Sequence, residues 1–306
     1  MPLSYDQISA ITEKKFIPKM HDNIFDSNIL LKKLKEKSLQ KLDGGERIIV
    51  PLNYAQASAS AWYTGSDTLS TTDNDQITAA EYTWKQLYPN ISITGLDESK
   101  NSGDAAILNF VQQKVKIAEM TMKDKLGDGI YSDGTDSKAI VGLRDIVATD
   151  QSVGGISQSA YSWWAGKVDS STTTLTMAAM QSLFNNASID SEHPNVITAT
   201  RALYNSYYAL LQPQQRFQDS KDASGGFANL LFNGVPVFAD SKCPTSHMFM
   251  LNTNFLHMFV HKDRDMKFEP FQKPVNQDVK LAKILWLGAL GSSNNRMHGK
   301  LSAITA

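Results

Sequence analysis

The chain has 306 residues, and its 30 lysines and arginines nearly balance 31 aspartates and glutamates, giving a formal net charge of -1. This balance argues against a protein whose main function is to bind nucleic acid, because such proteins are usually strongly basic. The single cysteine, Cys243, excludes an internal disulfide and a cysteine-only metal site. The N-terminus carries no secretory signal, and no apolar run approaches the roughly 18 residues that span a bilayer. We therefore expect a soluble protein, made in the cytoplasm, with no membrane partner.

Residues 1–44 are predicted to form a lysine-rich N-terminal arm. Within it, Leu30, Leu31 and Leu34 lie at helical spacing after Asp26 and Ser27, either of which could cap a helix. Such a short helix is marginal on its own in water. Two interpretations stay open: a solvated surface helix, or an arm that docks on a partner subunit or an anionic interior. In the second interpretation Leu30, Leu31 and Leu34 contact a neighbouring subunit.

Two strand-like segments enclose a polar tip. The first is RIIVPLNY over 47–54, the second is YTWKQLYPNISITG over 82–95, and residues 58–76 between them are mostly Ser, Thr, Asp, Asn and Gly. A long two-stranded arm of this kind cannot bury its own faces, because an isolated hairpin is only marginally stable in water. The pattern therefore predicts an extended hairpin that lies on another copy of the chain.

The hairpin also carries large aromatic residues. Trp62 sits near the polar tip, where its own subunit offers little to cover it, while Trp84 and Tyr88 lie on the return segment. Aromatic side chains are enriched at the buried centres of protein interfaces. We predict that Trp62, Trp84 and Tyr88 contact a neighbouring subunit, with packing in the chain's own core as the alternative for each.

Beyond the hairpin, helices and strands alternate irregularly. A long amphipathic helix is predicted from Ile107 to Leu126, ended by Gly127 and Gly129. Further helices are expected over 175–187, capped by Thr174, and over 202–211. The predicted strands cover 195–200, 229–232, 235–239, 248–251, 256–260, 284–290 and 300–305. Because no regular βαβ repeat connects these elements, the fold class is α+β.

The sequence offers no catalyst. It contains no nucleophile elbow, Walker loop or dinucleotide fingerprint. His257 and His261 have the i, i+4 spacing of a zinc-binding pair but no glutamate base between them, and Asp128, Asp133 and Asp136 lack the ligand spacing of a calcium loop. A soluble metal-dependent hydrolase using the two histidines is kept as an alternative. The favoured expectation is a protein that is not an enzyme, with no catalytic residue, cofactor or metal.

The ordered ensemble of segments resembles a tailed-bacteriophage major capsid protein. The resemblance rests on the hairpin ending in YTWKQLYPNISITG, the lysine-bearing long helix, and the later segments LLQPQQRF, GGFANLLFNGVPVFAD and MLNTNFL. It covers nearly the whole chain, and no single segment would suffice. It implies a Hong Kong 97-like capsid fold.

The resemblance also implies a domain map and a function. Residues 1–44 become the N-terminal arm, 45–98 the extended loop, 99–145 the peripheral domain with its spine helix, 146–261 the axial domain and 262–306 the peripheral return strands. The implied function is self-assembly, in the host cytoplasm, of hexamers and pentamers into the icosahedral shell of a virion around double-stranded DNA that is packaged without sequence specificity. A portal protein and, as an option, a decoration protein are further implied partners.

Two departures and one alternative accompany the resemblance. The arm begins within a few residues of Met1, so we expect any scaffolding protein to be a separate chain. Residues 48–84 contain no lysine, so we expect no covalent cross-linking through the extended loop. An encapsulin-type bacterial compartment shell is the alternative with the same fold; it would hold protein cargo in place of DNA.

Overall fold

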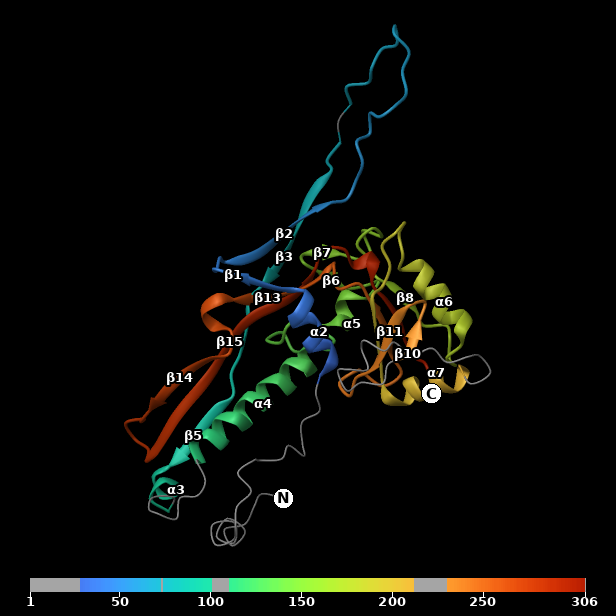
Figure 1. Ribbon diagram of the computed structural model, residues 1–306. Coiled ribbons are helices and arrows are strands. Elements are labelled where there is room, and N and C mark those ends of the chain that lie inside the picture. Colours follow the sequence, from blue (N-terminus) through green and yellow to red (C-terminus); the bar gives the residue numbers. More distant parts are fainter. Residues whose placement is uncertain (1–27, 73, 101–109, 212–229, 306) are drawn as a thin grey trace.

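The computed structural model describes residues 28–72, 74–100, 110–211 and 230–305. Figure 1 shows a body built on two sheets, from which one long hairpin projects. The arm residues 1–27, with the proposed caps Asp26 and Ser27, lie outside these ranges, as does the predicted helix start at Ile107. Helices and strands are interspersed as expected for the α+β class, which is confirmed.

One long strand, β15 (Val279–Ser292), organises the first sheet. Gly288 of this strand pairs with both Val260 and Lys85, so its partners must lie on opposite edges. One edge carries β13 and then β14, the other carries β4 and β5, and β1 pairs in parallel with β13. These strands are β1 (Leu39–Leu42), β4 (Lys85–Leu87), β5 (Asn90–Thr94), β13 (Leu256–His261) and β14 (Lys267–Gln272).

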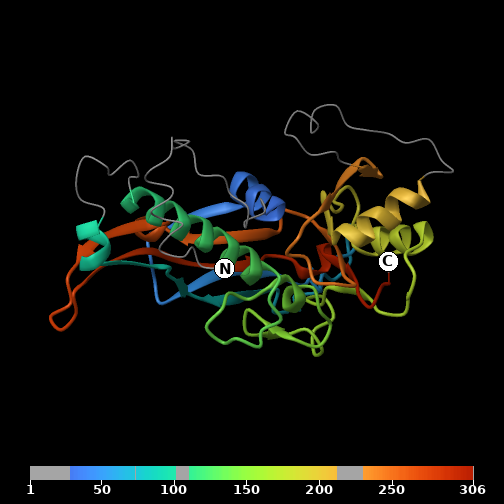
Figure 2. The same ribbon diagram turned by 90° about the horizontal axis from the view of Figure 1, so that it is seen from below.

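The helix α4 (Phe110–Ile130) lies along this sheet, as Figures 1 and 2 show. Its buried side chains recur every four residues, at Ala118, Met122, Leu126 and Ile130. The predicted end at Gly127 and Gly129 is wrong, because the helix continues through both. A Cβ on Gly127 would lie 2.3 Å from the Asn28 side chain, so this glycine permits close packing and does not end the helix.

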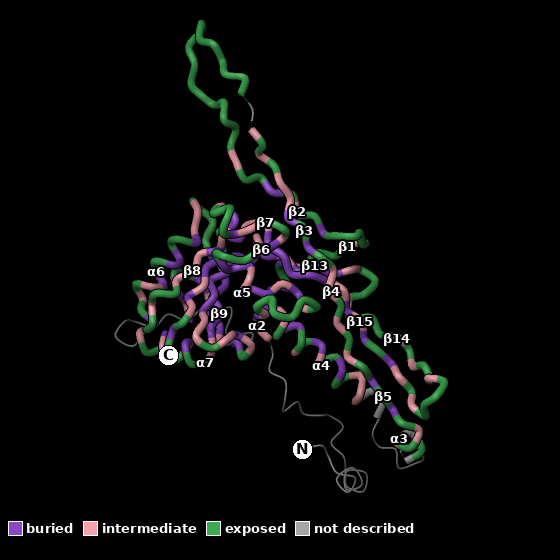
Figure 3. Tube along the Cα trace, turned by 180° about the vertical axis from the view of Figure 1, so that it is seen from behind, coloured by how far each residue is buried: buried purple, intermediate pink, exposed green. Residues whose placement is uncertain are grey.

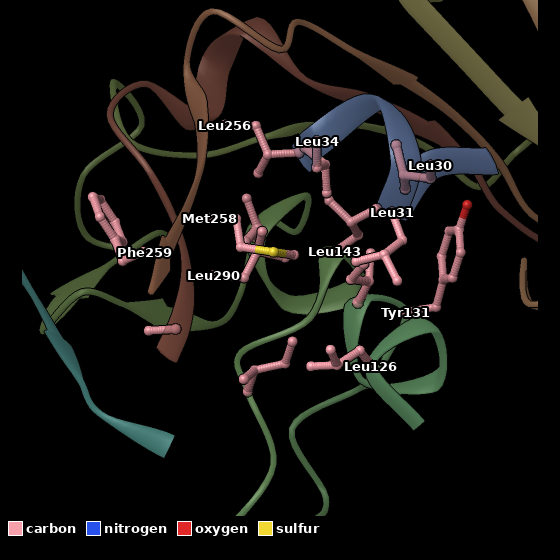
Figure 4. Packing of buried hydrophobic residues seen from close by; sticks show 14 of the residues in the cluster. Leu30, Leu31, Leu34, Leu126, Tyr131, Leu143, Leu256, Met258, Phe259 and Leu290 are labelled. Carbon is pink, nitrogen blue, oxygen red and sulfur yellow. The ribbon is translucent and has the colours of Figure 1, made fainter. Parts of the chain in front are cut away.

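The arm helix α2 (Ile29–Lys37) belongs to the core of its own chain. Its N-cap is Asn28, whose side-chain oxygen accepts a hydrogen bond from the Leu31 amide at 2.7 Å. Leu30 and Leu34 have exposed fractions of 0%, and Leu31 is buried beside them. Figure 4 shows these leucines facing Leu256, Met258, Leu290, Leu126 and Leu143. The prediction that Leu30, Leu31 and Leu34 contact a neighbouring subunit is therefore wrong, because they close the space between α4 and the sheet.

The second sheet has the strand order β10-β11-β9-β12-β16-β8. Its strands are β8 (Lys167–Asp169), β9 (Val196–Ala199), β10 (Leu230–Phe232), β11 (Val235–Ala239), β12 (Met248–Leu251) and β16 (Gly299–Leu301). The helices α6 (Met177–Asn186) and α7 (Arg201–Leu210) pack on it. The cap of α6 is Thr176, which accepts from the Ala179 amide at 3.1 Å, and not the predicted Thr174.

The buried strand β12 connects two hydrophobic clusters. Phe249 and Leu251 belong to the cluster that contains α2 and α4, while Met248 and Met250 belong to the cluster under α6 and α7. Successive side chains of a strand point to opposite faces, so one strand contributes to both. The two sheets are therefore joined through a shared, buried element.

The remaining elements are short. They are β2 (Arg47–Asn53), β3 (Ile77–Thr83), α3 (Gly95–Lys100), α5 (Leu143–Ile146), β6 (Ser152–Val153), β7 (Ile156–Ser157) and the 3-10 turns η1 (Lys262–Arg264) and η2 (Asn295–Met297). The strands expected at 195–200, 235–239, 248–251 and 256–260 are confirmed, whereas β1 and β14 were not predicted. Within the described ranges, none of the helices combines the length and apolar character that crossing a bilayer requires.

We predict that Leu34→Ala lowers the free energy of unfolding by about 2–5 kcal/mol, because it opens a cavity in a closed core. The matched control is Lys32→Ala on the exposed side of the same helix, which should change stability by less than about 0.5 kcal/mol. Urea unfolding at fixed protein concentration measures both. Equal midpoints for the two variants would contradict the placement of α2 in the core.

A second prediction concerns pH. His298 is fully buried; its Nδ1 accepts from the Asn252 amide and its Nε2 contacts the Ser292 hydroxyl, both at 3.3 Å. Burial lowers the pKa of this imidazole to about 3, from an ordinary value near 6.5. As the pH falls below 6.5 the unfolded chain binds a proton that the folded chain does not, so stability decreases.

Between pH 7 and pH 5, His298 should therefore cost the wild type about 2 kcal/mol of unfolding free energy, a loss that His298→Gln lacks. The control is His193→Gln, at an exposed position. Urea unfolding at both pH values gives the comparison. The prediction fails if the wild type and the His298 variant lose the same free energy on acidification.

Candidate intersubunit interface

The projecting hairpin is formed by β2 and β3, which pair antiparallel from Arg47 opposite Thr83 to Asn53 opposite Ile77. The predicted return strand at 82–95 is therefore wrong for most of its length. β4 and β5 within that segment pair with β15 instead, because their apolar residues, such as Ile91, are buried in the first cluster. The hairpin ends at Thr83, and the chain then enters the sheet.

The base of the hairpin is fixed to the body. The buried Tyr82 hydroxyl donates to the Ser292 carbonyl at 2.7 Å and accepts from the Ser292 amide at 2.9 Å, which ties β3 to the end of β15. Burial raises the pKa of Tyr82, so the hydroxyl keeps its proton. The Glu81 amide donates to the carbonyl of Gly154 in the β6–β7 turn at 2.9 Å. The hairpin therefore leaves the body in a defined direction.

Beyond the paired strands, hydrogen bonds from side chains to the backbone join the two sides of the hairpin, in place of a continuous series of backbone–backbone hydrogen bonds. The Asn74 side-chain oxygen accepts from the Ser58 amide at 2.9 Å, and its amide nitrogen donates to the Gln56 carbonyl at 3.3 Å. A turn closed by the Asp67 amide and the Thr64 carbonyl, 2.8 Å apart, forms the end. We call residues 54–76 the tip segment. Figure 3 shows it mostly exposed, with Ala55, Asn74 and Gln76 half-buried near the paired strands.

The tip segment presents unpaired apolar side chains to solvent. Trp62 has an exposed fraction of 104%, and Tyr63 and Leu69 are also mostly exposed. Ile49 and Ile77 on the outer face of the strands add to this surface. Exposed apolar groups that cluster on a projecting element are typical of a protein interaction site. Sequence reasoning found Trp62 from its polar surroundings but missed the others, which carry no comparable signal.

The other predicted contact residues behave differently. Trp84 is partly buried against its own core, donates its indole N–H to the Gly45 carbonyl at 2.8 Å, and has its ring 5.9 Å from that of His261. Packing in its own chain is thus the interpretation that fits Trp84. Tyr88 is 63% exposed, so its contact with a neighbour stays a prediction, as does that of Trp62.

The histidines show no metal-site geometry. His257 bonds through its ring nitrogens to Gln40 and Ser293, at 3.3 and 3.2 Å, while the His261 ring accepts from the Asp263 amide. In the acidic loop, Asp133 pairs with Arg144 at 3.0 Å. Across the described ranges no group of three or more His, Cys, Asp or Glu could hold a metal ion.

Comparison with known proteins gives a likeness of structure. No protein-family model and no curated protein matches the sequence. The capsid of cyanophage A-1(L) superposes with a TM-score of 0.72 at 17% identity, covering 100% of this chain and 99% of that one. The protein of Mycobacterium phage Bobi gives 0.63 at 8% identity with full coverage of both. The SrpI encapsulin of Synechococcus elongatus gives 0.65 at 10% identity, covering 97% and 95%.

These similarities cover 97–100% of the chain. The chain therefore has the Hong Kong 97-like fold of tailed-bacteriophage major capsid proteins.

Proposed function

We propose that this chain is the major capsid protein of a tailed double-stranded DNA bacteriophage, and that it is a structural protein with no enzymatic activity. The observation that carries the proposal is the projecting hairpin, whose apolar tip residues, Trp62 above all, are left uncovered by the described part of the chain. Its setting is a fold shared along its full length with capsid proteins of several phages.

A thin shell needs a large contact area between neighbouring subunits. A shell subunit must bind its neighbours through surfaces that differ from each other, and such heterologous contacts close into rings of five or six. An element that reaches over an adjacent copy enlarges the buried area without thickening the wall. Because the base of the hairpin is fixed by Tyr82 and Ser292, its free part is available for this contact.

The partners follow from this role. The chain would bind copies of itself in hexamers and pentamers, assemble in the host cytoplasm and reside in the virion. It would enclose packaged double-stranded DNA without reading its sequence, and would meet a portal, a separate scaffolding protein and, as an option, a decoration protein.

An encapsulin-type compartment shell is the second candidate, favoured by the similarity to the SrpI encapsulin. The two functions differ in cargo. Particles purified after expression of the chain with a phage packaging system would contain DNA in the first case, and a co-assembled protein in the second.

We predict that the purified chain forms pentamers, hexamers or closed shells. Sedimentation velocity over a wide range of concentration and salt, with negative-stain microscopy of the same samples, measures this. The control is a chain that lacks residues 55–75, which retains the paired strands β2 and β3 and should fold but assemble poorly. A wild-type chain that remains monomeric under all conditions contradicts the proposal.

We also predict that assembled particles are not cross-linked through the hairpin. An isopeptide bond needs an amine nucleophile, and residues 48–84 contain no lysine. Denaturing gels of boiled particles should show monomer. A heat-stable ladder whose linkage maps to residues 48–84 would refute this prediction.

A further inference from the structure

We propose that a cavity at the C-terminal end of α4 receives the Trp62 indole of a neighbouring copy. The inference rests on the proposed function, because it names the surface on which the hairpin of another subunit docks. The cavity, which we call the α4-end cavity, has a volume of about 340 Å³ and lies between β4, the end of α4 and the loop 132–140.

The α4-end cavity suits an aromatic side chain. Its apolar lining comes from Leu87, Leu126, Ala139, Ile140 and Trp286. An indole buries about 150–250 Å² when it is enclosed and gains additional stabilisation against another aromatic ring. The volume is within the range of about 300–1,000 Å³ that is typical of sites for compact organic groups.

The charges around the cavity favour an acidic partner. Lys85, Lys125 and Lys138 line it together with Asp128 and Asp136. Asp128 is already paired with Lys242 at 2.9 Å and with Lys125 at 3.8 Å. Among the described residues Lys138 has no ion-pair partner.

The tip segment supplies the complementary charge. It contains three aspartates, Asp67, Asp73 and Asp75, and no lysine or arginine, so it has a net charge of -3. Opposite charges across an interface guide the approach of the two surfaces and fix their register. An acidic tip with a central tryptophan therefore matches a lysine-lined cavity with an aromatic wall.

The occupant must come from another copy. The tip segment projects away from the body, whereas β4 and α4 lie on the far side of the hairpin base, as Figures 1 and 3 show. The nine residues from Tyr54 to Trp62 can span about 30 Å at most, which lets the tip reach over an adjacent subunit. The same projection carries Trp62 away from the cavity of its own chain.

Two other cavities in the described part of the molecule fit less well. The groove of about 320 Å³ at the hairpin base contains Leu42 and Phe259, but much of its wall is the strand β2 of the hairpin itself, together with the polar Gln40 and His257. The cavity beside Pro270 and Pro274 has only about 150 Å³ and no aromatic wall.

A double-mutant cycle tests the contact. Trp62→Ala removes the indole, and Ala139→Trp fills the α4-end cavity, which Ala139 lines. Each variant is expected to lower the temperature at which assembled particles disrupt, and the double variant should disrupt at no lower a temperature than the worse single one, because both remove the same contact. Ala202→Trp on the exposed side of α7 is the matched control and should disrupt like the wild type.

A third variant keeps the test valid if the Ala139→Trp protein fails to fold. Lys138→Glu reverses the charge at the rim and should lower the disruption temperature in the wild-type background but not in the Trp62→Ala background. The inference is overturned if Trp62→Ala lowers the disruption temperature additively with Ala139→Trp or with Lys138→Glu, or if Ala139→Trp alone leaves that temperature unchanged. Particles that still form in these cases uphold the proposed function. If the wild type forms no particle, both fail.

Discussion

The structure depends on the pairing of β15 along both of its edges. This strand of 14 residues is buried over its second half, where its backbone groups must be satisfied on both sides, since an unpaired buried amide or carbonyl is costly. Four strands from two parts of the chain meet this need. A Cβ on Gly291 would lie 2.8 Å from the Tyr82 ring, so the glycine there lets the hairpin base dock on the strand. The first sheet and the base of the hairpin thus both depend on β15.

The apolar residues that fold the chain differ from those that we propose for assembly. The leucines of α2, the stripe of α4 and both sides of β12 are covered within the chain. A second set of apolar groups, on the outer face of the hairpin and on its tip segment, is exposed, as are single residues elsewhere such as Leu96 and Val275. A change in the first set should act on the stability of one subunit, whereas a change in the second should act on the proposed contacts between subunits. The two effects can therefore be separated experimentally.

Local patterns predicted the elements whose burial repeats with a helical or strand period, such as α7, β9, β11 and β12. They failed where contacts with residues distant in the sequence determine what an element packs against. The spacing of Leu30, Leu31 and Leu34 indicates that the helix buries one face, but it does not indicate whether that face packs on the same chain or on a neighbour. The pattern around Ile91 predicts a strand, but it does not identify β15 as the strand with which it pairs. The exposure of Trp62 was predicted from its polar neighbours, while the α4-end cavity could not be predicted, because its walls come from three separated stretches of the chain.

The lack of basic residues in the hairpin has a consequence for probing the molecule. Trypsin cleaves after lysine and arginine, and between Arg47 and Lys85 the chain contains neither. The exposed tip segment therefore contains no site that trypsin can cleave, even though exposed loops are usually the first to be cut. Proteases that cleave beside aromatic residues would instead report directly on whether the stretch around Trp62 and Tyr63 is covered.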